Sequence, residues 1–232
     1  MNIALREIAL KKGYKIYVRP FELNIWGIRS SDSTPQTFDD KIVVFWKDNS
    51  GFWNEKVYKA TTDPSTYELQ NPSFLAAQQR GLPLMQQGQY EGLYRLSVGS
   101  KRLGIEELQQ VKDAKYFRDY DRDAFLDFNN GRETTENNGT NIHVGANYGQ
   151  TSINVGAWGA GCQVIASWAD MAEFVGLCKK HISLYGNSFS YTLVDYRVIN
   201  RSRWRQGVYI AGGTLVLGVL GYFGYEYWKK LE

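Results

Sequence analysis

Short runs of aromatic and β-branched residues alternate with polar segments along the N-terminal half of the chain. Runs of this composition, bounded by Gly, Pro, Asn, Asp and Ser, predict β-strands separated by turns. The polar segments SSDSTPQTFDD, KDNSG and TTDPSTYELQNPS have the composition expected of such turns and loops. We therefore predict strands at Tyr14–Val18, Leu23–Ile28, Lys41–Lys47, Glu55–Ala60, Gly92–Val98 and Ala114–Asp119.

Helical periodicity is strongest after Ser167. Asp170 follows Ser167 at the spacing typical of a helix N-terminus, and Gly186 is suited to end the helix. Apolar residues between these two ends recur at the spacing of one helix face. They are Trp168, Met171, Val175, Cys178 and Ile182. We expect Cys178 to fill the core. We expect His181, near the helix C-terminus, to be a surface residue or one that compensates the helix dipole, not a ligand.

The whole pattern predicts a mainly β protein, in the sense of a β-rich α+β fold with one or two short helices. Weaker helical signals occur at Asn2–Lys12, Pro72–Arg80 and Ile105–Val111, and further strands are predicted at Ile142–Val144 and Phe189–Ile199. A polar loop, NNGRETTENNGT, precedes the first of these strands. The length of 232 residues allows one sizeable domain. Residues 1–90 form a β-rich region, either separate from residues 91–200 or part of the same domain.

The C-terminal region has a different pattern, because Gln206–Tyr225 contains no charged residue. A helix over residues 206–228 would be about 30 Å long, close to the thickness of a bilayer core. Aromatic residues lie near both ends, arginines precede the segment and lysines follow it, as in membrane-spanning helices. We predict a transmembrane helix over residues 206–228; the alternative is a C-terminal helix buried in a larger assembly.

Charge and cysteine content exclude several classes of protein. The 27 Lys and Arg nearly balance the 24 Asp and Glu, so there is no electrostatic case for nucleic-acid binding. The chain has only two cysteines, which is too few for a disulfide framework, and it has two histidines. Their positions, 143, 162, 178 and 181, match no usual zinc-finger spacing.

The strongest chemical signal is Cys162 at the end of a glycine-rich segment, AWGAGCQV, with His143 upstream in NIHVG. A thiolate is the reactive form of cysteine, and a nearby imidazole is a usual means of generating it near neutral pH. Glycines such as Gly161 allow a sharp turn whose N–H groups can face a developing oxyanion. The pair alone is a weak signal, since Cys162 could equally be a small buried apolar residue.

The segments NIHVG and GAWGAGCQVI together resemble the L,D-transpeptidase catalytic domain (YkuD-like) family, and especially a phage-associated branch ending in Ser-Ala-Gly-Cys-Gln-Val. The likeness covers about residues 92–194, with the signature confined to residues 141–165. This resemblance implies a YkuD-like β-sandwich or barrel catalytic domain over residues 91–200. It also implies a cysteine enzyme that acts on the stem peptides of peptidoglycan.

The resemblance also implies roles for individual residues. Cys162 would attack a stem-peptide carbonyl, and His143 would take the thiol proton and return it to the leaving amine. The N–H groups of Gly161 and Cys162 would stabilise the oxyanion. The acyl group would pass from the thioester to an amine or to water. The residues expected to contact substrate are Trp158, Tyr148 and Gln163.

Three positions depart from the family signature. Gly159 stands where the broad family has serine, Ala160 where it has histidine, and Val164 where it has arginine. A valine cannot hold a substrate carboxylate as an arginine does. The alternative is therefore a catalytically inactive structural or peptidoglycan-binding virion membrane protein with the same fold. A cytoplasm-facing cysteine peptidase acting on a protein is a third interpretation.

The predicted layout suggests a biological context. The N-terminal segment lacks the apolar core of a signal peptide, and a C-terminal anchor alone would leave the domain in the cytoplasm, whereas peptidoglycan lies outside. A phage particle avoids this conflict. We therefore expect a membrane-anchored protein of a bacteriophage virion, with peptidoglycan stem peptides, the lipid bilayer and other virion proteins as partners.

A cluster of acidic residues raises the question of a metal. Asp119, Asp121 and Asp123 approximate the start of a calcium-binding loop. Ala124 occupies the position where such loops have glycine, and Asn130 the position of the bidentate glutamate. We therefore favour a charged turn, keep calcium as a weak alternative, and predict no other cofactor.

Overall fold

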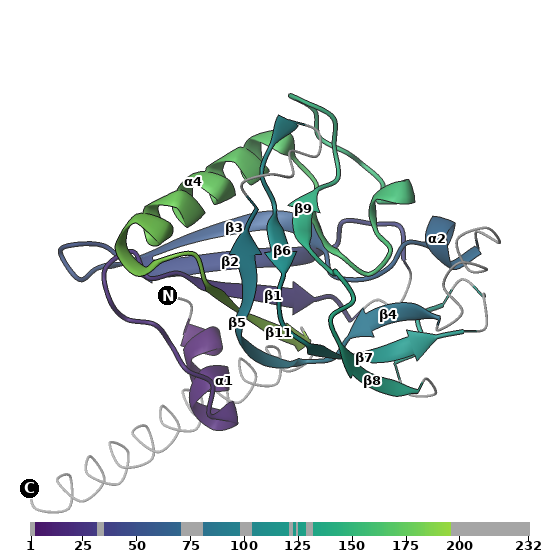
Figure 1. Cartoon of the computed structure of the whole chain (residues 1–232), viewed down its shortest axis with the longest axis horizontal. Helices are drawn as coiled ribbons and strands as arrows, with labels where there is room; N and C mark the ends of the chain where they lie inside the picture. Colours follow the sequence, from purple (N-terminus) through teal and green to yellow (C-terminus); the bar gives the residue numbers. More distant parts are fainter. Residues whose placement is uncertain are drawn as a thin grey trace, which may run out of the picture.

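The computed structural model describes residues 3–31, 35–70, 81–97, 104–120, 123, 125–128 and 132–195, and it confirms the prediction of a mainly β fold with few helices (Figure 1). Eight strands close into a barrel in the order β1-β11-β5-β6-β9-β10-β3-β2, and a second sheet has the order β4-β7-β8. The barrel strands are β1 (Asn24–Arg29), β2 (Asp40–Lys47), β3 (Trp53–Thr61), β5 (Gly88–Leu96), β6 (Leu108–Gln110), β9 (Ile142–Val144), β10 (Gln163–Ile165) and β11 (Phe189–Asp195). Those of the second sheet are β4 (Leu82–Met85), β7 (Ala114–Asp119) and β8 (Glu133–Glu136).

The barrel encloses the main hydrophobic core. Side chains alternate along each strand, so one set fills the interior and the other faces outward. Two strand pairs, β1–β11 and β9–β10, are parallel, and the other pairs of the barrel are antiparallel. The inward residues of the barrel strands include Ile25, Ile42, Val44, Tyr58, Leu93, Leu108, Ile142, Ile165 and Leu193.

The long helix α4 (Trp168–Tyr185) has the predicted ends and the predicted apolar face. The Ser167 side chain accepts a hydrogen bond from the Asp170 N–H, and Gly186 ends the helix with φ of +85°. The apolar face lies in the same core as the barrel interior. Cys178 is fully buried on this face, as predicted. Helix α4, which directly follows β10, is therefore packed against the barrel through this face.

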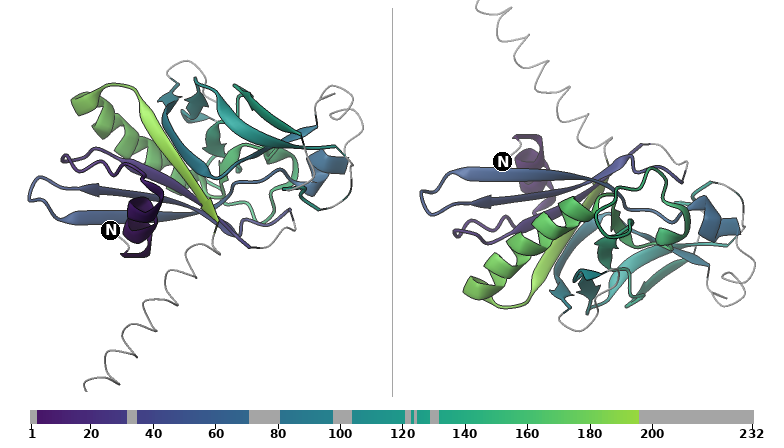
Figure 2. Two further views of the ribbon diagram at one scale, coloured as in Figure 1. Left: turned by 90° about the horizontal axis from the view of Figure 1, so that it is seen from below. Right: turned by 90° about the horizontal axis from the view of Figure 1, so that it is seen from above.

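Two other helices of the described residues lie outside the barrel. Helix α1 (Ile3–Lys12) packs Leu5 and Ile8 against the outward residues Trp26 and Phe45 of β1 and β2 (Figure 2). The short helix α2 (Thr66–Gln70) follows β3 and lies near a single 3-10 turn, η2 (Gly156–Trp158). Helix α1 thus covers part of the outer surface of the barrel, whereas α2 packs through Leu69 against β4 of the second sheet.

The strand predicted at Tyr14–Val18 does not form, for a specific reason. The N–H and C=O of Lys15 pair with the side-chain amide of Gln89, at 2.8 and 2.9 Å. Those of Tyr17 pair in the same way with the amide of Asn24, at 2.8 and 2.9 Å. Side-chain amides thus take the place of a neighbouring strand. The prediction was wrong because local composition does not reveal such partners.

Two further predictions are corrected. The segment Ile105–Val111 is not helical, since Leu108–Gln110 forms strand β6 between β5 and β9. The polar loop before the histidine strand contains strand β8, Glu133–Glu136, paired with β7. Both strands are short, and pairing with neighbouring strands outweighs their local preference.

The two halves of the chain contribute to one barrel. Strands β1 and β3, from residues 1–90, pair with β11 and β10 respectively. The strand β5 spans the expected boundary at residue 90. Within the described part of the chain no helix is both long and apolar enough to cross a bilayer. The segment 206–228 lies outside the described residues, so its transmembrane helix stays a prediction.

Candidate active site

His143 lies in β9, and Cys162 immediately precedes β10, the parallel neighbour of β9. In the parallel β9–β10 pair, His143 is directly opposite Val164. Its neighbour Ile142 belongs to the barrel core, so the alternation along β9 turns His143 outward together with Val164. The fold therefore brings the two predicted residues to the same strand pair.

The backbone sets the protonation pattern of the His143 ring. The side chain is buried, and Nδ1 lies 2.9 Å from the carbonyl oxygen of Val144. A carbonyl oxygen can only accept a hydrogen bond, so Nδ1 carries the hydrogen. The neutral imidazole then has its lone pair on Nε2. A ring held in this tautomer is the form that can take a proton from a thiol.

The thiol of Cys162 is only partly covered by neighbouring side chains. Its side chain is half-buried against an apolar cluster that includes Val164, Phe38 and Trp158. The Sγ atom is 3.8 Å from the carbonyl oxygen of Gly139. The thiol therefore has apolar packing on one side and remains partly open to solvent on the other.

A tight glycine turn leads into Cys162. Gly161 has φ of +106°, a conformation that favours glycine. A Cβ atom at this position would come 2.5 Å from the carbonyl oxygen of Pro83. The carbonyl of Gly159 accepts a hydrogen bond of 2.7 Å from the N–H of Ser65. The turn thus needs glycine at residue 161 and is held from outside by two other segments. The proposed contact of its N–H groups with an oxyanion stays a prediction.

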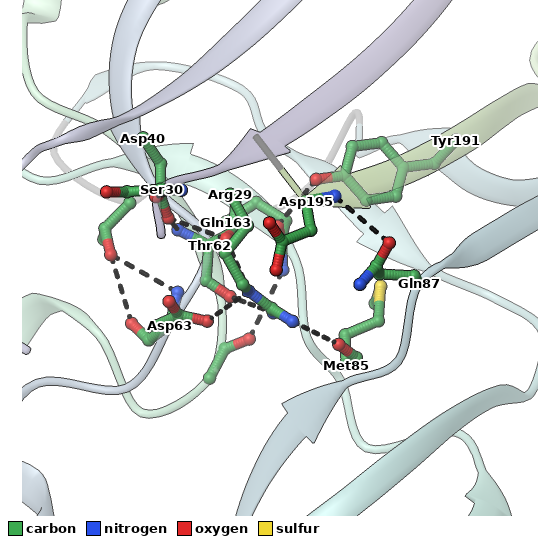
Figure 3. Close-up of polar contacts among 12 residues, drawn as sticks. Arg29, Ser30, Asp40, Thr62, Asp63, Met85, Gln87, Gln163, Tyr191 and Asp195 are labelled. Carbon is green, nitrogen blue, oxygen red and sulfur yellow. Dashed lines mark hydrogen bonds and ion pairs between the residues drawn. The ribbon is translucent and has the colours of Figure 1, made fainter. Parts of the chain in front are cut away.

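The three predicted substrate contacts have different locations. Trp158 lies in the apolar cluster beside Cys162. Tyr148 is exposed and packs edge-on against Trp168, with ring centroids 4.6 Å apart. Gln163 is fully buried inside the barrel, where its Oε1 accepts a hydrogen bond of 2.7 Å from the Tyr191 hydroxyl (Figure 3). Only Trp158 is brought to the thiol, and the position of Gln163 argues against direct contact with substrate.

The position of the family arginine is occupied by a packed valine. Val164 is fully buried among Phe38, Val155 and Ala166. A Cβ atom added to Gly145 would come 2.6 Å from its Cγ1. Gly145 is therefore required for close packing between β9 and β10, and Val164 offers no charge to a substrate.

Sequence reasoning missed a buried polar network beside the thiol. The Oε1 of Gln110 accepts hydrogen bonds from the N–H and hydroxyl of Thr140, at 2.8 and 2.9 Å, and from the hydroxyl of Tyr116 at 3.0 Å. Tyr94 donates to the carbonyl of Thr140 at 2.9 Å. Together these bonds fix the backbone next to Gly139, whose carbonyl contacts Cys162. These residues have no common spacing in the sequence that could have revealed the network.

The acidic cluster does not form a metal site within the described residues. No group of three or more His, Cys, Asp or Glu side chains is arranged there to bind a metal ion. Asp119 is buried, and its Oδ2 accepts a hydrogen bond of 3.1 Å from the Asp127 N–H. Asp123 caps a local turn by accepting from the Phe125 N–H at 2.6 Å. Asp121 lies outside the described residues, so the calcium alternative is supported by nothing that the structure shows.

The second histidine, His181, is not a surface residue, which was one of the two roles predicted for it. It is buried, and its Nδ1 accepts a hydrogen bond of 3.1 Å from the N–H of Leu23. The ring packs on Phe189, with centroids 4.7 Å apart. The surface prediction was wrong because the chain before β1 folds over this end of α4.

Comparisons of the chain with protein-family models, with curated proteins and with solved structures give no match. The resemblance in the sequence signature therefore has no independent support, and the geometry of the site is the main basis for a functional conclusion.

Proposed function

We propose that this chain is a cysteine acyl-transfer enzyme in which Cys162 is the nucleophile and His143 the general base. The observation that supports the proposal is the parallel pairing of β9 with β10, in which His143 is opposite Val164, two residues after Cys162. The carbonyl of Val144 adds a second support, because it leaves the lone pair of the His143 ring on Nε2. The partial exposure of Cys162 adds a third.

The reaction proceeds through two acyl transfers. The His143 Nε2 takes the thiol proton of Cys162, and Sγ attacks the carbonyl carbon of an amide to form a tetrahedral oxyanion. The C–N bond then breaks, and the imidazolium returns its proton to the leaving amine. An amine or a water molecule attacks the resulting thioester and transfers a proton to His143. The C–S bond then breaks, and His143 passes this proton to the departing sulfur, which restores the thiol. A hydrogen-bond donor to the oxyanion contributes roughly 3 kcal/mol in enzymes of this kind.

The substrate class in this proposal is the stem peptide of peptidoglycan. It rests on the resemblance of the segments around His143 and Cys162 to the L,D-transpeptidase signature. Residues 206–228 anchor the protein in a bilayer, and the protein belongs to a bacteriophage virion. These two parts of the proposal rest on the uncharged C-terminal segment and on the phage-like form of the signature.

Purified sacculi provide the test. The full chain is incubated with sacculi, and released D-alanine and altered muropeptides are measured for the wild type and for Cys162→Ala. Cys178→Ala is the matched control, because that thiol is buried in the core and lies on α4. The proposal predicts turnover by the wild type and the control and none by Cys162→Ala. Equal turnover by all three proteins, or turnover by none, contradicts it.

A second candidate is a structural or peptidoglycan-binding virion protein without turnover. The buried Val164 favours it, since the described residues place no cation in the apolar cluster around this position. This candidate predicts that the wild type and Cys162→Ala bind sacculi equally in a sedimentation assay and that neither alters muropeptides. Binding without chemistry would therefore replace the enzyme proposal.

A further inference from the structure

A buried arginine, Arg29 at the end of β1, joins two separate segments of the chain (Figure 3). Its Nη2 donates to the carbonyl of Thr62 at 3.2 Å, and its Nε donates to the Thr62 hydroxyl at 3.2 Å. Its Nη1 donates to the carbonyl of Met85 at 2.9 Å. One planar guanidinium thus fixes both the segment after β3 and the end of β4. A fork of several donors can do this, whereas a single ammonium group cannot.

These two segments are the walls of the turn that precedes Cys162. On one side the Gly159 carbonyl is bonded to the Ser65 N–H, and a Cβ atom at Gly159 would lie 3.4 Å from the carbonyl oxygen of Asp63. On the other side Gly161 packs directly on Pro83 in β4. A displacement of either wall therefore displaces the turn.

A third contact links Arg29 to the same turn. The guanidinium carbon lies 4.9 Å from the centre of the Phe128 ring. Phe128 belongs to a small apolar cluster with Leu69 and Leu82, against which Ala160 of the turn also packs. The guanidinium therefore supports the turn from the 61–65 segment, from β4 and from this cluster.

Buried carboxylates hold the guanidinium in this place. The Nε atom lies 2.7 Å from Oδ1 of Asp63. Asp40 accepts hydrogen bonds from the N–H and hydroxyl of Thr62, at 2.6 and 2.7 Å, and so fixes the residue that Arg29 binds. A buried charge is costly without such partners. A cluster of this kind is retained where it fixes a particular geometry.

We propose that Arg29 is a positioning residue for Cys162, acting through Thr62, Met85 and Phe128 on the turn at residues 159–162. The inference rests on the proposed function only in taking Cys162 as the nucleophile. Its immediate consequence is a property of the thiol itself, namely its rate of reaction with a small alkylating reagent.

The test measures alkylation of Cys162 by iodoacetamide as a function of pH, with the modified residue identified by mass spectrometry. Arg29→Lys keeps the charge and removes the fork. We expect the alkylation rate near neutral pH to fall by about tenfold, because the thiolate is the reactive form of cysteine and a displaced turn moves Cys162 away from its proposed base. The matched control is Arg19→Lys, the same substitution at a side chain that binds Glu22 instead. Circular dichroism and thermal melting report whether each variant is folded.

A folded Arg29→Lys variant whose rate and pH profile match those of the wild type overturns the inference. If that variant does not fold, Asp63→Asn is measured in the same way, with the same expected change and the same contradicting result. Failure of the proposed function is distinguishable, because it would appear as absent turnover of sacculi while the effect on alkylation persists. An altered rate in Arg19→Lys of the same size also contradicts the inference, because the effect would then be general.

Discussion

The two histidines of the chain have opposite hydrogen-bonding states. His143 lies on the outward face of β9 with Nδ1 against a carbonyl oxygen, so its hydrogen is on Nδ1. His181 lies at the C-terminal end of α4 with Nδ1 accepting from a backbone N–H, so its hydrogen is on Nε2. The first ring has its lone pair on Nε2, whereas the lone pair of the second is already used by the backbone. The backbone group at Nδ1 therefore sets which ring nitrogen carries the hydrogen in each of these two histidines.

The two cysteines differ in how deeply they are buried. Cys178 is fully buried on α4, and burial raises the pKa of its thiol far above the ordinary value. Cys162 is half-buried at the end of a glycine turn. The pair Cys162 and His143 thus belongs to one strand pair at the surface of the barrel, and the pair Cys178 and His181 belongs to the core side of one helix.

Replacing each histidine by asparagine tests this contrast most strongly. His143→Asn removes the base, and we expect the rate of thioester formation at Cys162 to fall by roughly 10²- to 10⁴-fold. His181→Asn disturbs the acceptor of the Leu23 N–H, so it should lower the free energy of unfolding by about 1–2 kcal/mol and leave the rate within about twofold. Single-turnover kinetics and urea denaturation measure the two effects. Similar losses of rate in both variants would show that the contrast has no chemical meaning.

A second test uses pH, because Asp63 and His181 titrate with opposite effects on the free energy of unfolding. Burial raises the pKa of Asp63 to about 7, against the opposing effect of Arg29, while Asp40 and Asp39 raise it further. Its Oδ1 lies 2.7 Å from the Nε of Arg29, but the effect of burial on the pKa is larger. The folded state then binds the proton more tightly than the unfolded state. Stability from this group is present at low pH and is lost as pH rises from about 4 to about 7.

Burial lowers the pKa of His181, against the opposing effects of its backbone partners and of Glu22. The folded state binds this proton less tightly, so stability from His181 is lost as pH falls below the ordinary histidine value. The free energy of unfolding should therefore fall less between pH 4 and pH 7 in Asp63→Asn, by up to roughly 4 kcal/mol. The loss of stability that His181 causes at lower pH should remain. Urea denaturation at a series of pH values measures this. An unchanged decline in Asp63→Asn would place its origin in other carboxyl groups.

The sequence predicts best where the signal is local. The helix α4 has a long apolar repeat and defined ends, and β1, β2 and β3 are dense in β-branched and aromatic residues. The short strand around His143 and the glycine turn before Cys162 are also local features, while the catalytic role of the pair stays a prediction. Each of these follows from neighbouring residues alone.

The rest depends on contacts between distant residues. Strand β6 is set by its neighbours in the barrel, since three residues carry little preference of their own. The cluster of Arg29, Asp40 and Asp63 joins residues that share no periodic spacing, and the sequence gives no sign that these charges are buried. The same holds for Gln110 and Thr140. Residues that hold a site in place are harder to predict than the residues that react.

The smallest effect is expected from Gly176→Ala, one of a matched pair of glycine substitutions that compare the turn at Cys162 with the exposed side of α4. Gly161→Ala introduces a Cβ at φ of +106° and 2.5 Å from the Pro83 carbonyl, so we expect a loss of at least about 2 kcal/mol. Gly176 lies within α4 with no atom near the position of a Cβ, so Gly176→Ala should stabilise the protein by roughly 0.5–1 kcal/mol. Thermal melting of both variants measures the difference. A Gly161→Ala variant as stable as the wild type would mean that the turn does not pack tightly against β4. The proposed effect of Arg29 on the turn through Met85 would then have no physical basis.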